Sequence, residues 1–240
     1  MKKKSKNILI LSTETIHHKY LINSISKKFP IKCILFEKKK FKASFFYKNP
    51  FIKEQKVFEK NFFFKNKEVN IDNNIPQFYC SDINSKFSYN LLKNNKPDFG
   101  IVFGTSKINP KIINLFKDGL INIHRGVISK YRGLDSDWWA IYHNDFLNIG
   151  VCVHRVSKKL DAGHIFKSSK LKIKKKMKIY QLQAYTTDIA TKIIILALKK
   201  YFKNKIVFNK QKKLGRYYSA MPTLLKILVK KKFERYVAKI

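Results

Sequence analysis

Short apolar runs separated by helical patterns restrict this chain to a small set of folds. Each run is four to seven residues long and is bounded by polar, glycine or proline residues, which is typical of a strand buried inside a sheet. The runs are Asn7–Ser12, Ile31–Glu37, Gly100–Phe103, Leu120–His124 and Gly150–Val156. Helical spacing of apolar residues occurs at Tyr20–Phe29, Asn84–Asn94, Pro110–Lys117 and Ile179–Phe202.

Strands that alternate with helices predict an α/β fold with a Rossmann-like, open, mostly parallel sheet and helices on both faces. The length of 240 residues suits one large domain with a short appendage. We therefore predict a main domain at residues 1–203 and a basic C-terminal extension at residues 204–240. Within the main domain, Lys38–Asn74 lacks clean periodicity and is predicted to be a helix plus an irregular insertion. In the extension, the leucines and Val229 among lysines predict a short amphipathic helix that docks on the core or, less favoured, rests on an anionic membrane.

The formal net charge of +37 suggests a polyanionic partner, but the composition argues against that interpretation. Only five of the 52 basic residues are arginine, the side chain that suits bidentate phosphate contacts. Lysine, asparagine, isoleucine and phenylalanine are all abundant and all have AT-rich codons, so genome composition explains the excess equally well. Nucleic-acid binding is thus not favoured, whereas an acidic small substrate would still benefit from the positive field.

Cysteine usage and the N-terminal sequence favour a cytoplasmic protein. Cys33, Cys80 and Cys152 are far apart and odd in number, which is typical of buried, reduced thiols. The first apolar run is too short for a signal peptide, and no run is long enough to span a bilayer.

The residues that point to chemistry lie between Leu120 and Ile165. Asn122 and His124 end a predicted strand two residues apart, so they face the same side. A loop that includes Lys130–Gly133 follows them, and Asp161 lies in a turn after another strand. Because ligands of open α/β sheets bind beyond the carboxyl ends of strands, all three side chains are expected to reach one pocket.

This segment resembles the catalytic domain of folate-dependent formyltransferases. The resemblance rests on Asn-x-His at 122–124, Tyr-Arg-Gly at 131–133, Gly-Val at 150–151 and Leu-Asp-Ala-Gly at 160–163. It covers roughly residues 5 to 200 by pattern and is strongest over 98–165. It implies the formyltransferase fold, 10-formyltetrahydrofolate as cosubstrate, and Asn122, His124 and Asp161 as the catalytic set. Many members of the family carry Ser-Leu-Leu-Pro where this chain has Gly126–Ser129. In the family this loop faces the acceptor side of the pocket, so the difference affects which acceptor is expected.

The chemistry of formyl transfer needs these residue types. When an amine attacks a formyl carbon, a negative oxygen develops, and Asn122 together with a protonated His124 would supply donors to it. Asp161 would favour the imidazolium and relay a proton from the amine. The reaction needs no metal and no covalent enzyme intermediate.

The resemblance also implies the binding residues. The pterin is expected between one wall that contains Phe103, Gly104 and Ile108 and another wall that contains Val156, Ser157 and Leu160. Tyr131 and Arg132 are expected to bind substrate, and bracing of the loop is an equal alternative for Arg132.

Trp138 and Trp139 are interpreted as core residues, and His17 and His18 as surface histidines. His154 and His164 are interpreted as structural.

Three acceptor classes follow from the resemblance. The 37-residue extension is shorter than a tRNA-binding domain, which disfavours methionyl-tRNA. The segment Ser12–His18 contains no glycine, which disfavours the phosphate loop of glycinamide ribonucleotide transformylases. Stand-alone sugar N-formyltransferases remain, so the expected acceptor is a nucleotide-linked amino sugar used for surface polysaccharide. A basic nucleic-acid-binding protein that retains the fold, and an idle scaffold that docks partners through its tail, are the alternatives from other classes.

Overall fold

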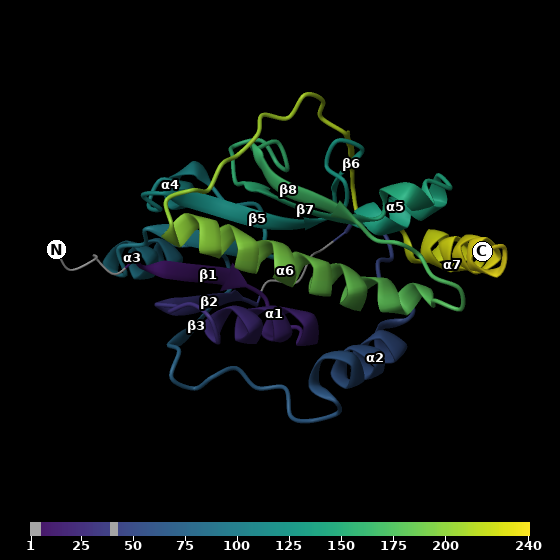
Figure 1. Cartoon of the computed structure of the whole chain (residues 1–240), viewed down its shortest axis with the longest axis horizontal. Helices are drawn as coiled ribbons and strands as arrows, with labels where there is room; N and C mark the ends of the chain where they lie inside the picture. Colours follow the sequence, from purple (N-terminus) through teal and green to yellow (C-terminus); the bar gives the residue numbers. More distant parts are fainter. Residues whose placement is uncertain (1–5, 39–42) are drawn as a thin grey trace.

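A seven-stranded sheet forms the centre of the computed structural model, which describes residues 6–38 and 43–240 (Figure 1). Residues 1–5 of the predicted domain and 39–42 of the predicted insertion lie outside the described residues. The strands are β1 (Ile8–Ser12), β2 (Cys33–Glu37), β3 (Gln77–Cys80), β4 (Phe99–Phe103), β5 (Gly119–Arg125), β7 (Gly150–Arg155) and β8 (Ile165–Lys170). Their order is β3-β2-β1-β4-β5-β7-β8, parallel from β3 to β5 and antiparallel at β7 and β8. The predicted mostly parallel sheet is confirmed.

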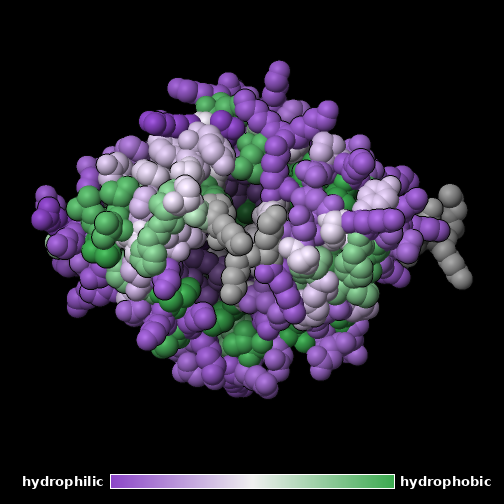
Figure 2. Space-filling view, turned by 180° about the vertical axis from the view of Figure 1, so that it is seen from behind, coloured by the Kyte–Doolittle hydropathy of each residue, from purple (hydrophilic) through white to green (hydrophobic). Residues whose placement is uncertain are grey.

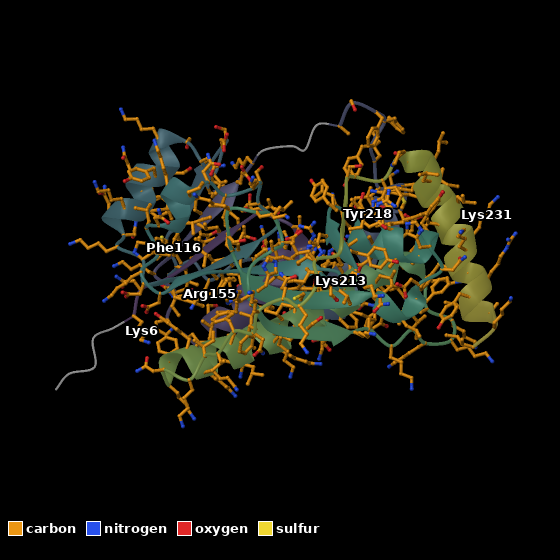
Figure 3. The ribbon with its side chains drawn as sticks, turned by 90° about the horizontal axis from the view of Figure 1, so that it is seen from above. Lys6, Phe116, Arg155, Lys213, Tyr218 and Lys231 are labelled. Atoms are coloured by element: carbon orange, nitrogen blue, oxygen red, sulfur yellow. The ribbon has the colours of Figure 1, made fainter. Side chains whose placement is uncertain are left out.

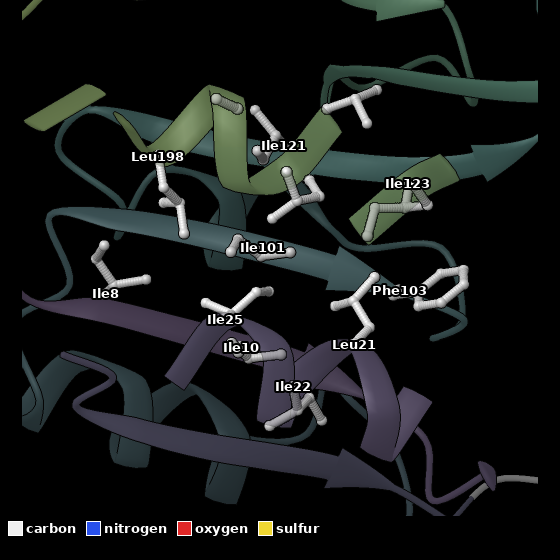
Figure 4. Packing of buried hydrophobic residues seen from close by; sticks show 14 of the residues in the cluster. Ile8, Ile10, Leu21, Ile22, Ile25, Ile101, Phe103, Ile121, Ile123 and Leu198 are labelled. Atoms are coloured by element: carbon white, nitrogen blue, oxygen red, sulfur yellow. The ribbon is translucent and has the colours of Figure 1, made fainter. Parts of the chain in front are cut away.

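Alternate residues of each central strand enter two different cores. On β1, Ile8 and Ile10 pack into the cluster under α1 and α6 (Figure 4), whereas Leu9 and Leu11 pack into the cluster on the opposite face. All four side chains are fully buried. Burial of an aliphatic side chain contributes about 1.5–3 kcal/mol, so a strand buried on both faces must be apolar throughout. This requirement is why the central strands were visible in the sequence.

Helices cover both faces, as predicted. The helices α1 (Ile16–Ser26) and α6 (Leu182–Phe202) lie on one face, and α3 (Lys86–Asn94) and α4 (Pro110–Ile113) lie on the other (Figure 1). The 3₁₀ turn η2 (Ile179–Gln181) leads into α6. α1 begins earlier than predicted because the Thr15 hydroxyl accepts a hydrogen bond from the His18 N–H and caps the helix. No helix in the described ranges has the length and apolarity needed to cross a bilayer.

The edge strands and the insertion were harder to predict. β3 has only four residues, and β8 is only half-buried. Neither strand therefore shows the run of apolar residues from which the central strands were predicted. The insertion contains α2 (Ile52–Phe64), in agreement with the helix expected there. Its side chains Gln55 and Glu59 are buried although polar, which explains the missing periodicity.

The C-terminal residues pack against the segment that follows β5. β9 (Arg216–Tyr218) pairs with β6 (Tyr131–Gly133), and α7 (Thr223–Ala238) packs on α5 (Ser136–Tyr142). The 3₁₀ turn η1 (Phe146–Asn148) completes this region. Val229, Phe233 and Val237 of α7 are buried in its apolar cluster, as expected for a helix that docks on the core.

A buried ion pair anchors α7. The Lys226 ammonium lies 2.9 Å from the Asp135 carboxylate and is 2% exposed, beside the rings of Tyr47 and Trp138. Burial lowers the pKa of Lys226, and Asp135 opposes that shift. Removal of one partner leaves the other charge buried and unpaired.

We expect Lys226→Met to lower the free energy of unfolding by about 2–3 kcal/mol, measured by urea denaturation. Lys230→Met is the matched control, because Lys230 pairs with Glu234 on the half-exposed side of the same helix. The control is expected to change stability by less than about 1 kcal/mol. Equal effects of the two substitutions would show that the buried pair does not anchor the helix.

Candidate active site

A cavity of about 160 Å³ opens at the carboxyl ends of β4 and β5. This is the edge of an open α/β sheet at which ligands bind. Its walls come from the end of β4 and the loop after it, from β5, from the end of β6 and from the β7–β8 connection. Its lining includes Gly104, Ile108, Asn122, His124, His154, Val156, Ser157, Leu160 and Asp161.

The structure brings Asn122, His124 and Asp161 together. Asn122 and His124 project from the same side of β5 into the cavity. Asp161 returns to it from the turn after β7, where its backbone is left-handed with φ of 50°. The Asp161 Oδ2 lies 3.4 Å from the His124 Nδ1 and accepts a 2.9 Å hydrogen bond from the Gly133 N–H. The predicted convergence of the three side chains on one pocket agrees with the structure.

The contacts of His124 define its tautomer. Nε2 lies 3.1 Å from the Tyr131 carbonyl oxygen, which only accepts, so Nε2 carries the proton and donates it. The Ser136 hydroxyl lies 3.2 Å from the same nitrogen. In the neutral ring Nδ1 is therefore unprotonated and faces the Asp161 carboxylate. A proton that arrives at Nδ1 would be held between the two groups.

Burial and charge act in opposite directions on this pair. Burial lowers the pKa of His124, and the nearby Asp161 carboxylate counters part of that shift. Burial by itself raises the pKa of Asp161, but His124, His154 and the Gly133 N–H lower it to about 2. At neutral pH the site thus holds a neutral imidazole beside an ionised carboxylate. The sequence had suggested a protonated His124, and the difference arises from the burial of this side chain.

His154 is a site residue that the sequence interpretation left as structural. It lies directly opposite Asn122 in the antiparallel register of β5 and β7. Its Nδ1 donates to the Arg155 carbonyl oxygen at 2.8 Å, and its Nε2 lies 3.3 Å from the Asn122 amide nitrogen and 3.4 Å from the Asp161 Oδ1. His154 thereby orients the Asn122 amide and leaves the second N–H of that amide for a ligand. This pairing could not be predicted from the sequence, because it depends on the antiparallel direction of β7 relative to β5.

The predicted pterin-binding residues mostly line the cavity. Gly104 and Ile108 lie on one wall, and Val156, Ser157 and Leu160 lie on the other, as expected. The structure differs at Phe103, whose ring packs 4.1 Å from that of His18 in the core. Successive residues of a strand point to opposite faces, so Val102 lines the cavity and Phe103 cannot.

Tyr131 and Arg132 do not line the cavity. The Tyr131 hydroxyl donates to Asp145, and its ring stacks on Tyr218. The Arg132 guanidinium donates to the Gly215 and Leu160 carbonyl oxygens and so braces the turn that carries Asp161. Their predicted role in substrate binding stays a prediction.

The C-terminal segment also holds the Asp161 turn. The Gln211 amide donates to the carbonyl oxygens of Asp161 and Gly163 at 3.1 and 2.7 Å. Figure 3 places Lys213 near the centre of the molecule when it is viewed from above, over the middle strands. Residues beyond 204 therefore take part in shaping the site.

A second group of buried polar side chains lies beside the cavity, on the far side of Gly104. His17 contacts Glu59 at 3.1 Å, and His18 packs so tightly on Gly104 that an added Cβ would lie 2.4 Å from its ring. The expectation that His17 and His18 lie on the surface was wrong, because α1 begins at Ile16 and its first turn faces inward. Burial lowers the pKa of both histidines well below 6.5. Beside this group, burial raises the pKa of Asp137 to about 6 despite the positive charge of Arg125.

Gly126 gives His124 its space. Its φ is +148°, and a Cβ there would lie 2.8 Å from the His124 Nε2 and 2.6 Å from the Ser136 Cβ. We expect Gly126→Ala to displace the imidazole and to lower kcat by on the order of tenfold to 100-fold, with a smaller change in KM. Steady-state kinetics test this, and Ala162→Gly at the Asp161 turn controls for a backbone change nearby. Wild-type kcat in Gly126→Ala would contradict the proposed tight packing.

The sequence matches the family described as Formyl transferase over residues 27–198, which is more than half of the chain. Among curated proteins it is 29% identical over 147 residues to a methionyl-tRNA formyltransferase of Buchnera aphidicola. That alignment covers 60% of this chain and 46% of the relative, so the chain spans about half the length of the curated relatives it matches.

Two solved structures share the fold. A 4-N formyltransferase from Francisella tularensis aligns with a TM-score of 0.61 and 20% identity, over 90% of this chain and 77% of that one. A formyltransferase from Anoxybacillus kamchatkensis, solved with UDP-4,6-dideoxy-4-formamido-L-AltNAc and tetrahydrofolate, aligns with a TM-score of 0.55 and 20% identity. The latter alignment covers 89% of this chain and 85% of that one.

Proposed function

Because this chain belongs to the formyl transferase family, we propose that it transfers a formyl group from 10-formyltetrahydrofolate to a primary amine. The observation that carries the proposal is the convergence of Asn122, His124 and Asp161 on one cavity at the carboxyl edge of the sheet. An amide donor, a neutral imidazole and an ionised carboxylate around one space are the groups that acyl transfer to an amine requires.

The contacts suggest a role for each residue. Asn122, with one amide N–H held by His154, directs the other toward the oxygen of the formyl group, on which negative charge develops. His124 takes the proton of the attacking amine at Nδ1, because Nε2 is already committed to Tyr131. Asp161 stabilises the imidazolium that forms. The His124 imidazolium then returns the proton to N10 of the folate as the bond between the formyl carbon and N10 breaks and tetrahydrofolate leaves. This assignment keeps the catalytic set expected from the sequence.

The cavity suits the cosubstrate. Apolar side chains of Val102, Ile108, Val156 and Leu160 line its walls, together with the proposed catalytic residues. A flat pterin ring between these apolar side chains would leave the N10 formyl group of the folate to face Asn122, His124 and Asp161. The folate supplies the activated formyl group, and the protein supplies the oxygen donor and the proton acceptor.

We propose a nucleotide-linked amino sugar as the acceptor, in a cytoplasmic step of surface polysaccharide synthesis. Support comes from three solved structures that this chain covers over 77–88% of their length: a 4-N formyltransferase, a sugar N-formyltransferase and a formyltransferase solved with a UDP-linked formamido sugar. A net charge of +37 would also attract a nucleotide diphosphate. The second candidate is methionyl-tRNA, because the curated relatives with 29% identity carry that name.

The test is a formylation assay with the purified chain. 10-Formyltetrahydrofolate is incubated with UDP- and dTDP-linked 3-amino and 4-amino deoxysugars or with methionyl-tRNA, and the release of tetrahydrofolate and the product mass are followed. Formylation of a nucleotide sugar supports the proposal. Formylation of methionyl-tRNA alone would show that the proposed acceptor is wrong and that the proposed reaction is right. If no amine is formylated, and the folate is not consumed, the proposed activity is wrong.

The depressed pKa of His124 predicts a particular pH dependence. A base must be unprotonated, and burial moves the pKa of His124 below its usual 6.5, so the loss of rate that protonation of His124 causes should begin only below pH 6.5. Protonation of the acceptor amine by itself already lowers kcat/KM as the pH falls. The slope of log(kcat/KM) against pH should therefore steepen further where His124 begins to protonate. If the steeper slope began above pH 6.5, the assignment of His124 as a buried base would be wrong.

A further inference from the structure

The exposed side of α7 is apolar along its first half and basic along its second half. Leu224, Ile227 and Leu228 are 78%, 43% and 44% exposed, although the opposite side of the helix is buried in the core. The same exposed stripe continues with Lys231 and Arg235, one and two turns further on. A docked helix normally exposes only its polar residues, so the apolar half is unexpected.

A second segment extends the apolar half. Phe45 and Phe46 are 40% and 65% exposed and lie beside the start of α7. The Phe46 carbonyl oxygen accepts from the Thr223 N–H at 3.2 Å, and the Thr223 hydroxyl accepts from the Lys48 N–H at 2.8 Å. Figure 2 views the molecule from behind, with α7 at the left, and shows apolar and hydrophilic residues adjoining at that end.

The basic half adjoins an open pocket. Lys232, Arg235 and Lys239 line it, together with Asn144, Phe146 and Tyr236. Lys232 donates to the Tyr142 carbonyl oxygen, and the only acidic residue of the helix, Glu234, pairs with Lys230. The pocket wall thus carries three positive charges and no carboxylate. Figure 3 shows Lys231 at the outer end of the molecule, pointing away from it.

We propose that this surface, formed by Phe45, Phe46 and the exposed stripe of α7, binds the chain peripherally to an anionic phospholipid bilayer. The apolar half would enter the boundary between headgroups and acyl chains, and the basic half with its pocket would contact headgroup phosphates. Lysine stems suit this boundary because they lie along apolar surface while the ammonium stays in water. The inference is independent of the proposed formyl transfer.

Charge and chemistry favour a bilayer over other occupants. A second copy of this chain would bring two molecules of +37 charge together, which opposes association through a basic surface. Nucleic acid would account for the basic half but would leave the exposed leucine, isoleucine and phenylalanine side chains without a contact. An anionic bilayer satisfies both halves.

Vesicle co-sedimentation of the full chain tests the proposal. Wild type should bind vesicles of equal phosphatidylglycerol and phosphatidylcholine and should bind phosphatidylcholine alone weakly. The variant Leu224→Gln/Ile227→Gln/Leu228→Gln should lose about 100-fold in partitioning. Lys231→Gln/Arg235→Gln should lose about 30-fold, as expected for two charges near an anionic surface.

Matched controls separate this surface from general charge and general apolarity. Lys199→Gln/Lys200→Gln removes the same charge from the exposed end of α6, and Val207→Gln removes an exposed apolar side chain elsewhere. Both controls should bind anionic vesicles as wild type does, and thermal melting should show every variant folded. Loss in the controls equal to that in the α7 variants would overturn the proposal. It would also be overturned if the apolar variant kept its affinity, or if sedimentation showed a dimer that the apolar variant abolishes.

Discussion

Replacing Asp161 by asparagine is expected to lower kcat for formyl transfer about 10³-fold, within the range for loss of an acid–base partner. Asparagine has nearly the same shape, so the turn held by Arg132, Gln211 and the Gly133 N–H should persist. The change removes the negative charge that lies 3.4 Å from the His124 Nδ1. The imidazolium formed during proton transfer would then be buried without a counter-charge.

The pH profile of Asp161→Asn distinguishes this mechanism from a disturbed fold. Because Asp161 opposes the lowering of the His124 pKa, its removal should move that pKa, and the acid limb, to still lower pH. A collapsed site would lower the rate at all pH values without moving the limb. Asp188→Asn is the matched control, since Asp188 pairs with Lys192 on the exposed side of α6, and it should leave kcat unchanged. A normal kcat in Asp161→Asn would end the proposed role of the carboxylate.

Replacing Asn122 by alanine is expected to lower kcat by about 10²–10³-fold and to change KM little. The Asn122 amide is the donor that His154 orients toward the cavity, and its contribution grows as charge develops on the substrate oxygen. A donor that acts mainly in the transition state affects kcat more than ground-state binding. Single-turnover kinetics with saturating folate measure the chemical step directly.

The control for Asn122→Ala is Asn23→Ala, which removes an exposed hydrogen bond from α1 to the Asn70 carbonyl oxygen. It should leave the rate unchanged. His154→Ala should give part of the Asn122→Ala defect, because the amide would remain but would lose its orientation. His154 Nε2 also lies 3.4 Å from the Asp161 Oδ1, so the losses in the double variant should be less than additive, since His154 acts in part through Asn122. Fully additive losses would show that His154 acts independently.

The sequence determined the central sheet and indicated the three side chains that we propose as the catalytic set. Four strands are buried on both faces, namely β1, β2, β4 and β7. Such strands need consecutive apolar residues, and a short stretch of sequence is enough to recognise them. Asn122 and His124 were assigned to one face because side chains alternate along any strand, whatever its neighbours. Asp161 was found through the resemblance, and the structure places it beside His124.

Only the tertiary structure decided which distant residues became partners. His154 faces Asn122 because β7 runs antiparallel to β5, and strand direction leaves no mark on local composition. Gln211 reaches the Asp161 turn, Gly215 accepts from Arg132, and Lys226 reaches Asp135, across separations of 50 or more residues. A polar residue is normally predicted to be exposed. The burial of His17, Glu59 and Lys226 depends on polar partners that are distant in sequence, so only the tertiary structure shows it. Burial of apolar runs is a local property of the chain, whereas satisfaction of buried polar groups is a property of the completed fold.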